Sequence, residues 1–111
     1  MADFQPGGNY EGADLEDADL ADKDISGANF SGANLRCAEF YNTNANGADF
    51  RNANLGEATF DNGADLRNAD LRGVNLADCC FMGEQLQGAK YDDDTKFPSG
   101  FDPATRGMVR A

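Results

Sequence analysis

Residues 26–60 read SGANFSGANLRCAEFYNTNANGADFRNANLGEATF, and a large apolar residue stands at every fifth position of this stretch except Ala45. Amphipathic helices repeat their apolar residues every three or four positions and strands repeat them every two, so neither element explains this period. A fixed period that continues over many residues indicates a repeat architecture, in which each repeat stacks on its neighbours.

Each five-residue repeat has the same composition. A small residue, usually Ala, stands two places before the central apolar residue, and Asp or Asn stands directly before it. Because side chains alternate along a strand, the small and the central residue face inward together and the Asp or Asn faces outward. Gly, Asn or Asp usually follows the centre by two places and accepts a positive φ, which predicts a tight corner of type II character. The central residues are Tyr10, Leu15, Leu20, Ile25, Phe30, Leu35, Phe40, Ala45, Phe50, Leu55, Phe60, Leu66, Leu71, Leu76, Phe81, Leu86 and Tyr91.

Three residues of side and two of corner close most simply into a square coil of about twenty residues, and residues one coil apart should then stack. The sequence contains such columns: Leu15, Leu35, Leu55 and Leu76; Leu20, Phe40, Phe60 and Phe81; Tyr10, Phe30, Phe50, Leu71 and Tyr91. We therefore expect an all-β solenoid, with aromatic rings stacked along its axis and neighbouring coils about 4.8 Å apart.

The A-[DN]-L-x-x pattern, over about residues 8–91, resembles the pentapeptide-repeat family. The resemblance implies a right-handed quadrilateral β-helix, and at this coil length the chain predicts about four coils. We expect an N-terminal lead-in over residues 1–7, the β-helix over 8–91, and a C-terminal loop and capping helix over 92–111.

The expected cap begins after Tyr91, where the repeat is predicted to stop. Asp102 is the predicted N-cap of a short helix, with Pro103 at its first helical position. Phe97, Phe101 and Met108 are expected to cover the apolar end and the unpaired strand edges of the last coil.

The fourth side of the coil departs from the pattern. Its inward small positions hold Lys23, Thr43, Ala64 and Glu84, where the other sides have Ala almost throughout. A charged residue at an inward position is costly unless it reaches solvent or finds a partner. One extra residue in the stretch ending at Gly63 predicts a bulge at the adjoining corner. The irregular side is either a tolerated defect or a place where a partner recognises this protein.

Charge is distributed unevenly along the chain. With 20 Asp and Glu against 9 Lys and Arg, and no His, the net charge is −11. The acidic residues of the first coil are Glu11, Asp14, Glu16, Asp17, Asp19, Asp22 and Asp24, with Lys23 as the accompanying base. This end is either a self-repelling surface that prevents edge-to-edge stacking or a docking surface for a basic partner. The candidate interaction surface comprises Lys23, Thr43, Gly63, Glu84, Asp14, Asp17, Asp19 and Asp22.

The sequence gives no support for catalysis. It has no His for acid–base work and no Gly-rich phosphate loop at a helix start, so we expect no enzyme, no catalytic residue, no metal and no cofactor. Asp49 and Asp70 should stack beside Arg51 and Arg72, where an ion-pair network is favoured over a calcium site. Basic residues are too few and too interspersed to predict direct nucleic-acid binding.

The cysteines and the termini bear on the compartment. Cys37 should lie at a corner, Cys79 inward and Cys80 outward, which favours reduced thiols, with a vicinal disulfide as the alternative. No apolar run is long enough to span a membrane, and the first ten residues do not read as a signal peptide. We expect a cytoplasmic protein, or a periplasmic or thylakoid-lumen protein if a targeting segment was removed.

Two functions follow from these observations. The first is a non-enzymatic interaction or scaffold module, monomeric rather than dimeric, with a protein partner. The second is a DNA mimic aimed at a topoisomerase or another DNA-binding protein. It is suggested by the excess of acidic residues and by the resemblance to a family that includes gyrase-binding members. Length favours the first, because four coils span about 20 Å, equivalent to about six base pairs.

Overall fold

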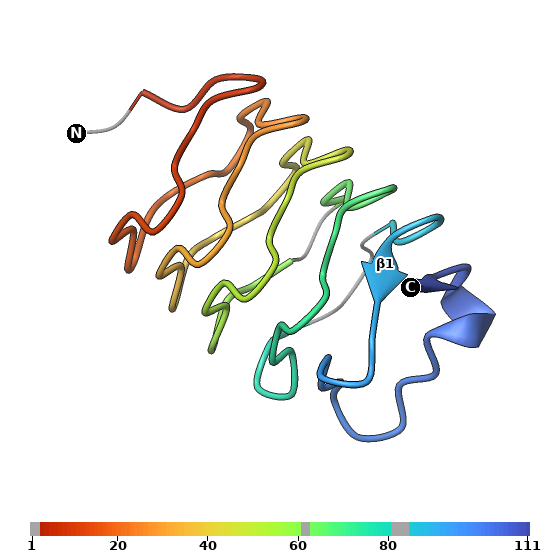
Figure 1. Cartoon of the computed structure of the whole chain (residues 1–111). Coiled ribbons are helices and arrows are strands. Elements are labelled where there is room, and N and C mark those ends of the chain that lie inside the picture. Colours follow the sequence, from red (N-terminus) through yellow and green to blue (C-terminus); the bar gives the residue numbers. More distant parts are fainter. Residues whose placement is uncertain (1–2, 61–62, 81–84) are drawn as a thin grey trace.

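The computed structural model describes residues 3–60, 63–80 and 85–111. Coils lie side by side along one axis, with the two termini at opposite ends of the stack (Figure 1). The molecule measures 36 × 25 × 22 Å along its principal axes. Most of the chain is neither helix nor extended sheet, because each side of a coil pairs with its neighbours through a single residue before the chain turns.

Parallel backbone pairing between neighbouring coils fixes the register. Asp14 pairs with Asn34 and Asn34 with Asn54, so the spacing is that predicted from the sequence. In this ladder the Asn34 amide donates to the Ala13 carbonyl (2.8 Å), and the Leu15 amide donates to the Asn34 carbonyl (2.7 Å). The outward residue of one coil therefore pairs with the two inward residues of the coil on its N-terminal side.

The corners follow from residues that accept a positive φ. In the first of them after Tyr10, the Ala13 amide donates to the Tyr10 carbonyl (3.1 Å) and Gly12 has φ 67°, as a type II turn requires. Residues other than Gly take the same conformation at Asp17, Asp22, Cys37, Asn42, Asn52, Glu57 and Asn68. Asp78 occupies this position without a positive φ, although the Cys79 amide still closes the turn to Leu76 (3.1 Å). A type I turn closes with the same hydrogen bond and needs no positive φ.

The predicted columns form the core. Phe30 and Phe50 stack with ring centroids 5.4 Å apart, Phe40 and Phe60 stack at 4.6 Å, and all four side chains are fully buried. Inward Ala residues such as Ala28 and Ala48 are also fully buried, which leaves room for the rings. The predicted partner Phe81 lies outside the described residues.

The fourth side accommodates its polar residues in two ways. Lys23 is exposed because it belongs to the first coil, over which no further coil is stacked. Thr43, one coil inward, is buried, and its hydroxyl donates to the Leu20 carbonyl (2.8 Å). The polar group at this inward position is thereby satisfied, which removes most of the cost of burying it. Glu84 lies outside the described residues.

The extra residue falls between Phe60 and Ala64, a stretch in which Gly63 is the described residue. Pairs on the N-terminal side of it are twenty apart, such as Glu39 with Thr59, whereas Asn44 pairs with Asp65 and the spacing becomes one longer. Gly63 is exposed and has φ 85°. The sides before and after this stretch therefore keep their stacking, and residues 61–62 of the predicted bulge lie outside the described residues.

Deleting Gly63 should leave the free energy of unfolding unchanged or raise it by up to about 1 kcal/mol, because a two-residue corner returns and a flexible residue is removed. Denaturant unfolding measures the difference. A loss of more than about 1 kcal/mol would mean that the coils beside the corner depend on the insertion.

The backbone ladder continues beyond Tyr91, in contrast to the loop expected from the sequence. Lys96 pairs with Asn75, and Thr95 fills the inward small position, where its hydroxyl donates to the Leu71 carbonyl (3.0 Å). Phe97 then occupies the central position and meets Tyr91 at a centroid distance of 5.6 Å. Phe97 follows Tyr91 by six positions instead of five. Because this spacing breaks the period, the sequence does not indicate that residues 95–97 form a further side of the coil.

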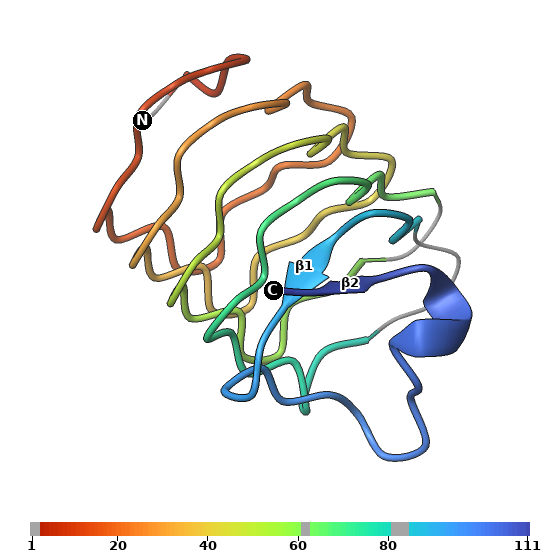
Figure 2. The same ribbon diagram turned by 45° about the vertical axis from the view of Figure 1, so that its right-hand side comes forward.

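The chain ends by adding a strand to its own last coil. Strand β1 (Lys90–Tyr91) pairs in parallel with β2 (Val109–Arg110), which lies over the C-terminal end of the stack (Figure 2). Met108 is buried, and Phe97 and Phe101 pack against the core. The segment predicted as a helix forms one 3₁₀ turn, η1 (Ala104–Arg106), which begins one residue later than expected and stops where Gly107 has φ 77°.

Candidate functional site

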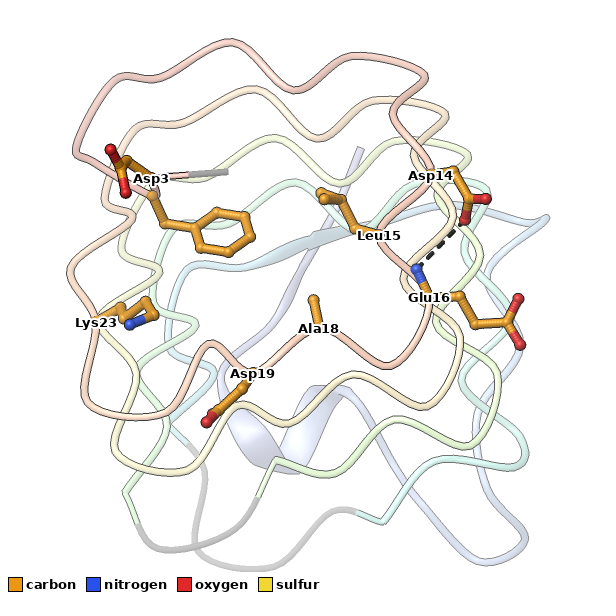
Figure 3. Close-up of a pocket in the computed structure, with 8 residues that line it drawn as sticks. Asp3, Asp14, Leu15, Glu16, Ala18, Asp19 and Lys23 are labelled. Atoms are coloured by element: carbon orange, nitrogen blue, oxygen red, sulfur yellow. Dashed lines mark hydrogen bonds between the residues drawn. The ribbon is translucent and has the colours of Figure 1, made fainter. Parts of the chain in front are cut away.

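The N-terminal end of the stack holds a cavity of about 720 Å³. Its floor is apolar, formed by Leu15 and Ala18, and Phe4 of the N-terminal segment also lines it; all three are partly buried. Charged side chains stand around the rim, and Figure 3 shows Asp14 and Glu16 on one side of the opening and Lys23 on the other. The charged lining residues are Asp3, Asp14, Glu16, Asp19 and Lys23.

The lead-in segment is held in place over this end. Phe4 packs on Tyr10 with centroids 5.3 Å apart, and the Tyr10 hydroxyl accepts from the Gln5 amide (2.9 Å) and donates to the Asp3 carbonyl (3.0 Å). A Cβ at Gly8 would meet the ring and hydroxyl of Tyr10, so the Tyr10 side chain would have to shift. The segment covers one part of the opening, and Leu15 and Ala18 remain only partly buried.

The outward carboxylates of the first coil each cap a corner with one oxygen. Oδ1 of Asp19 accepts the Ala21 amide (3.0 Å), and Oδ1 of Asp24 accepts both the amide (3.0 Å) and the hydroxyl (2.7 Å) of Ser26. These bonds, the hydroxyl bond first, lower the pKa of Asp24 below its ordinary value. Asn makes the same contact in other repeats, for example Asn29 with the Ser31 amide (2.9 Å). An acidic side chain is therefore not required to form the corner, because Asn makes the same hydrogen bond. The negative charge of Asp can serve another role.

The backbone of the same residues forms an open edge. Among the described residues, no backbone group pairs with the N–H or C=O of Asp14, Asp19 or Asp24. In the next coil the equivalent groups of Asn34 are both paired with the first coil. The N-terminal end therefore presents strand edges, an apolar cavity and negative charge together.

The residues predicted to form one interaction surface occupy different places. Lys23, Asp14 and Asp19 meet at the end cavity. Asp17 and Asp22 lie on exposed corners of the same coil, and the Asn42 amide group donates to Asp22 (2.9 Å). Thr43 is buried, Gly63 lies at a corner farther along the stack, and Glu84 is outside the described residues.

Sequence reasoning did not assign Leu15, Ala18 and Asp3 to the site. Leu15 and Ala18 fit the repeat, so the sequence predicts ordinary core positions for them. Their alternation identifies them as inward-facing, but it does not indicate that they stay only partly buried at the end of the stack.

A second group of charges lies along the sides of the stack and is internally paired. Arg51 contacts Asp49 (2.8 Å) and approaches Asp70 (3.8 Å), and Arg72 contacts Asp70 (2.6 Å). The Arg51 hydrogen bonds lower the pKa of Asp49. Burial raises the pKa of Asp70, but its bonds to Arg72 outweigh burial and leave that pKa lowered. This is the ion-pair network that the sequence favours at these four residues, and each exposed pair contributes about 0–1 kcal/mol.

The described part of the chain contains no other obvious chemical centre. Within it, no group of three or more His, Cys, Asp or Glu side chains is placed to share a metal ion. No helix in those residues is long and apolar enough to cross a membrane. Cys37, Cys79 and Cys80 are free thiols; Cys79 is buried and Cys80 exposed, as the alternation predicts.

Alkaline pH should destabilise the protein through Cys79. Its thiol donates to the Leu55 carbonyl (2.8 Å), and burial raises its pKa to about 12. The unfolded thiol ionises above about pH 8.5, so the stabilising effect of the neutral folded thiol is present below that pH and is lost as pH rises toward 12.

Relative to a Cys79→Ala variant, the free energy of unfolding of the wild type should therefore fall by about 1 kcal/mol per pH unit above pH 9. Urea unfolding at several pH values measures the slope. Cys80→Ala, at the exposed neighbour, should retain the wild-type slope; the same slope in Cys79→Ala as in the wild type would contradict the assignment.

Comparison with known proteins agrees with this architecture. The model of the pentapeptide repeat region matches residues 13–91. A solved pentapeptide-repeat protein of Nostoc (alr5209) is 32% identical, with a TM-score of 0.79, over 93% of this chain and 84% of that one. The chain therefore belongs to the pentapeptide-repeat family, whose members fold as right-handed quadrilateral β-helices.

Two further solved structures share the repeat. Rfr23 of Cyanothece is 30% identical over 80% of this chain and 56% of its own, with a TM-score of 0.46. A pentapeptide-repeat protein of the Arabidopsis thaliana thylakoid lumen is 28% identical over 95% of this chain and 59% of its own, with a TM-score of 0.34. A search of curated proteins found no match. Pentapeptide-repeat proteins are generally structural or interaction modules rather than enzymes.

Proposed function

We propose that this chain is a non-enzymatic protein-interaction module: a β-helix of about four coils, capped at its C-terminal end, that binds a basic protein partner at its open N-terminal end. The difference between the two ends carries the proposal. One end is covered by β2, Phe97 and Phe101, whereas the other holds a cavity of about 720 Å³ with a charged rim.

The rim charge supports a basic partner. Asp14, Glu16 and Asp19 surround the apolar floor formed by Leu15 and Ala18. Glu16 already binds one guanidinium from the C-terminal side, at 3.2 Å from Arg36, and remains exposed. A Lys or Arg of a partner would approach it from the opposite side, while an apolar side chain fills the cavity. Complementary charge of this kind speeds encounter and excludes acidic partners.

A DNA mimic receives less support. The longest dimension, 36 Å, equals about ten base pairs, but the carboxylates along the sides are not uniformly free. Asp49, Asp65 and Asp70 are each paired with an Arg, so the uncompensated acid is concentrated at one end. We propose a monomer, and sedimentation measures it; a stable dimer would favour the mimic.

The free thiols fit a reducing compartment, and we propose the cytoplasm. The periplasm or the thylakoid lumen remains the alternative if a targeting segment was removed.

Photo-crosslinking in the native cell tests the proposed surface. A crosslinking residue at Ala21, a corner of the first coil, should yield a protein adduct, and one at Asp94, near the opposite end, should not. Substituting Asp14→Asn and Asp19→Asn should abolish the adduct and leave the fold intact, because Asn occupies the same position in other repeats.

The control removes equal charge elsewhere, by Asp78→Asn and Asp94→Asn, which are both exposed residues of later coils and do not line the cavity. It should preserve the adduct. Equal adducts from Ala21 and Asp94, or an adduct unaffected by the loss of Asp14 and Asp19 charge, would refute the proposed function.

A further inference from the structure

The two ends of the stack present complementary strand edges, one covered by the chain itself and one open. At the C-terminal end the chain supplies its own strand: the Val109 amide donates to the Ala89 carbonyl (2.7 Å), and the Ala111 amide donates to the Tyr91 carbonyl (2.8 Å). Arg110 lies over the Tyr91 ring at 5.9 Å and pairs with Asp93. A segment of a few residues, parallel to the coil and carrying a basic side chain, therefore covers one side.

At the N-terminal end, on a different side of the coil, no strand of the described residues covers Asp14. The backbone N–H and C=O of Asp14 lie on the edge that faces the open end of the stack. No backbone group among the described residues pairs with them. Beside them lies the cavity over Leu15 and Ala18, and beyond them the Glu16 carboxylate. Unpaired edge groups bind extended peptides through main-chain hydrogen bonds, and neighbouring pockets select alternate side chains.

We infer that the open end binds an extended segment of its partner as an added parallel strand over residues 13–15, with alternating basic and apolar side chains. This inference rests on the proposed function and specifies the chemistry of the partner. The basic residue stands over Asp14, and the apolar residues on either side of it face the cavity.

The register follows from the ladder within the stack. There the first coil uses the N–H and C=O of its inward residues, Leu15 and Ala13, to pair with the outward residue Asn34. A parallel strand added on the other face of Asp14 takes the place of such a coil. It therefore pairs through the backbone of its own inward, apolar residues, while the amide of its basic residue points away from the protein.

This register makes the two kinds of backbone amide in the partner distinguishable. The probe is a synthetic peptide of alternating lysine and valine, with binding to the full chain measured by fluorescence anisotropy. N-methylation of the valine amides removes the donors that pair with Asp14 and should weaken binding roughly tenfold or more. N-methylation of the lysine amides keeps the same charge and should change binding by less than about threefold.

Protein variants complete the test. Asp14→Asn with Asp19→Asn should weaken binding of the unmethylated peptide roughly tenfold at low salt, and Asp78→Asn with Asp94→Asn should leave it within about twofold. Equal affinity of both methylated peptides would overturn strand addition, and a preference for methylated valine over methylated lysine would overturn the parallel register. No measurable binding of the unmethylated peptide would also overturn the inference. Each of these results leaves the crosslinking test of the proposed function unaffected.

Discussion

Replacing Phe60 by Ala should lower the free energy of unfolding by about 3–5 kcal/mol. Phe60 is fully buried, and its ring stacks on Phe40 with centroids 4.6 Å apart at an interplanar angle of 15°. Two terms add to this loss: the burial free energy of a large apolar side chain is lost, and a cavity is left on the axis of the stack. The cavity cannot collapse easily, because coils on both sides hold the neighbouring backbone. Against a total stability of about 5–15 kcal/mol, such a change removes a large fraction of it.

Denaturant unfolding measures this loss, and Phe4→Ala is the matched control. Phe4 is the same residue type but lies partly exposed over the open end, so its removal should cost about 1–2 kcal/mol. A loss below about 1 kcal/mol for Phe60→Ala would contradict the stacking of the aromatic column.

The five-residue period determines most of the fold because its consequences are local. A centre such as Phe30 requires only an Ala two places earlier and a residue with positive φ two places later to form its side and corner. Phe50 then stacks on Phe30 without any long-range information beyond the repeat length. For the same reason the single insertion before Ala64 can be located, since it shifts the position of every centre that follows by one residue.

The C-terminal end could not be predicted in the same way. Thr95 and Lys96 do not resemble the Ala and Asp of a regular repeat, and Thr95 is acceptable at the inward position because Leu71 offers a carbonyl to its hydroxyl. The pairing of Val109 with Lys90 depends on the path of the intervening turn. Neither contact repeats along the chain, so no periodic signal indicates it.

Part of the candidate site can be predicted from the sequence. The acid of the first coil is visible in the sequence, and Asp14 and Asp19 do line the cavity. The apolar floor is not visible, because Leu15 reads like any other centre of the repeat. The sequence places Lys23 at an inward position, where a charge is costly. The structure tolerates it because Lys23 belongs to the first coil and is exposed at the end of the stack.

The second large effect concerns association. Removing residues 98–111 takes away β2, Phe101 and Met108, and exposes the edge of β1 beside Tyr91 and Phe97. An uncovered strand edge around an apolar axis is a template for another molecule. The shortened chain should keep its β signal in circular dichroism, because each coil is held mainly by its neighbours, yet it should change from monomer to oligomer as concentration rises.

The matched control removes residues 1–4 and uncovers the opposite end. This truncation removes the packing of Phe4 on Tyr10. The carboxylates of Asp14, Glu16 and Asp19 surround the surface that it exposes. Like charges repel at low ionic strength and are screened over about 8 Å at physiological salt. Sedimentation should therefore find this variant monomeric at low salt and associated only at high salt, whereas the C-terminal truncation should associate at both. If the C-terminal truncation stays monomeric at both salt concentrations, residues 98–111 do not act as a cap, and their role is better explained as a second binding surface.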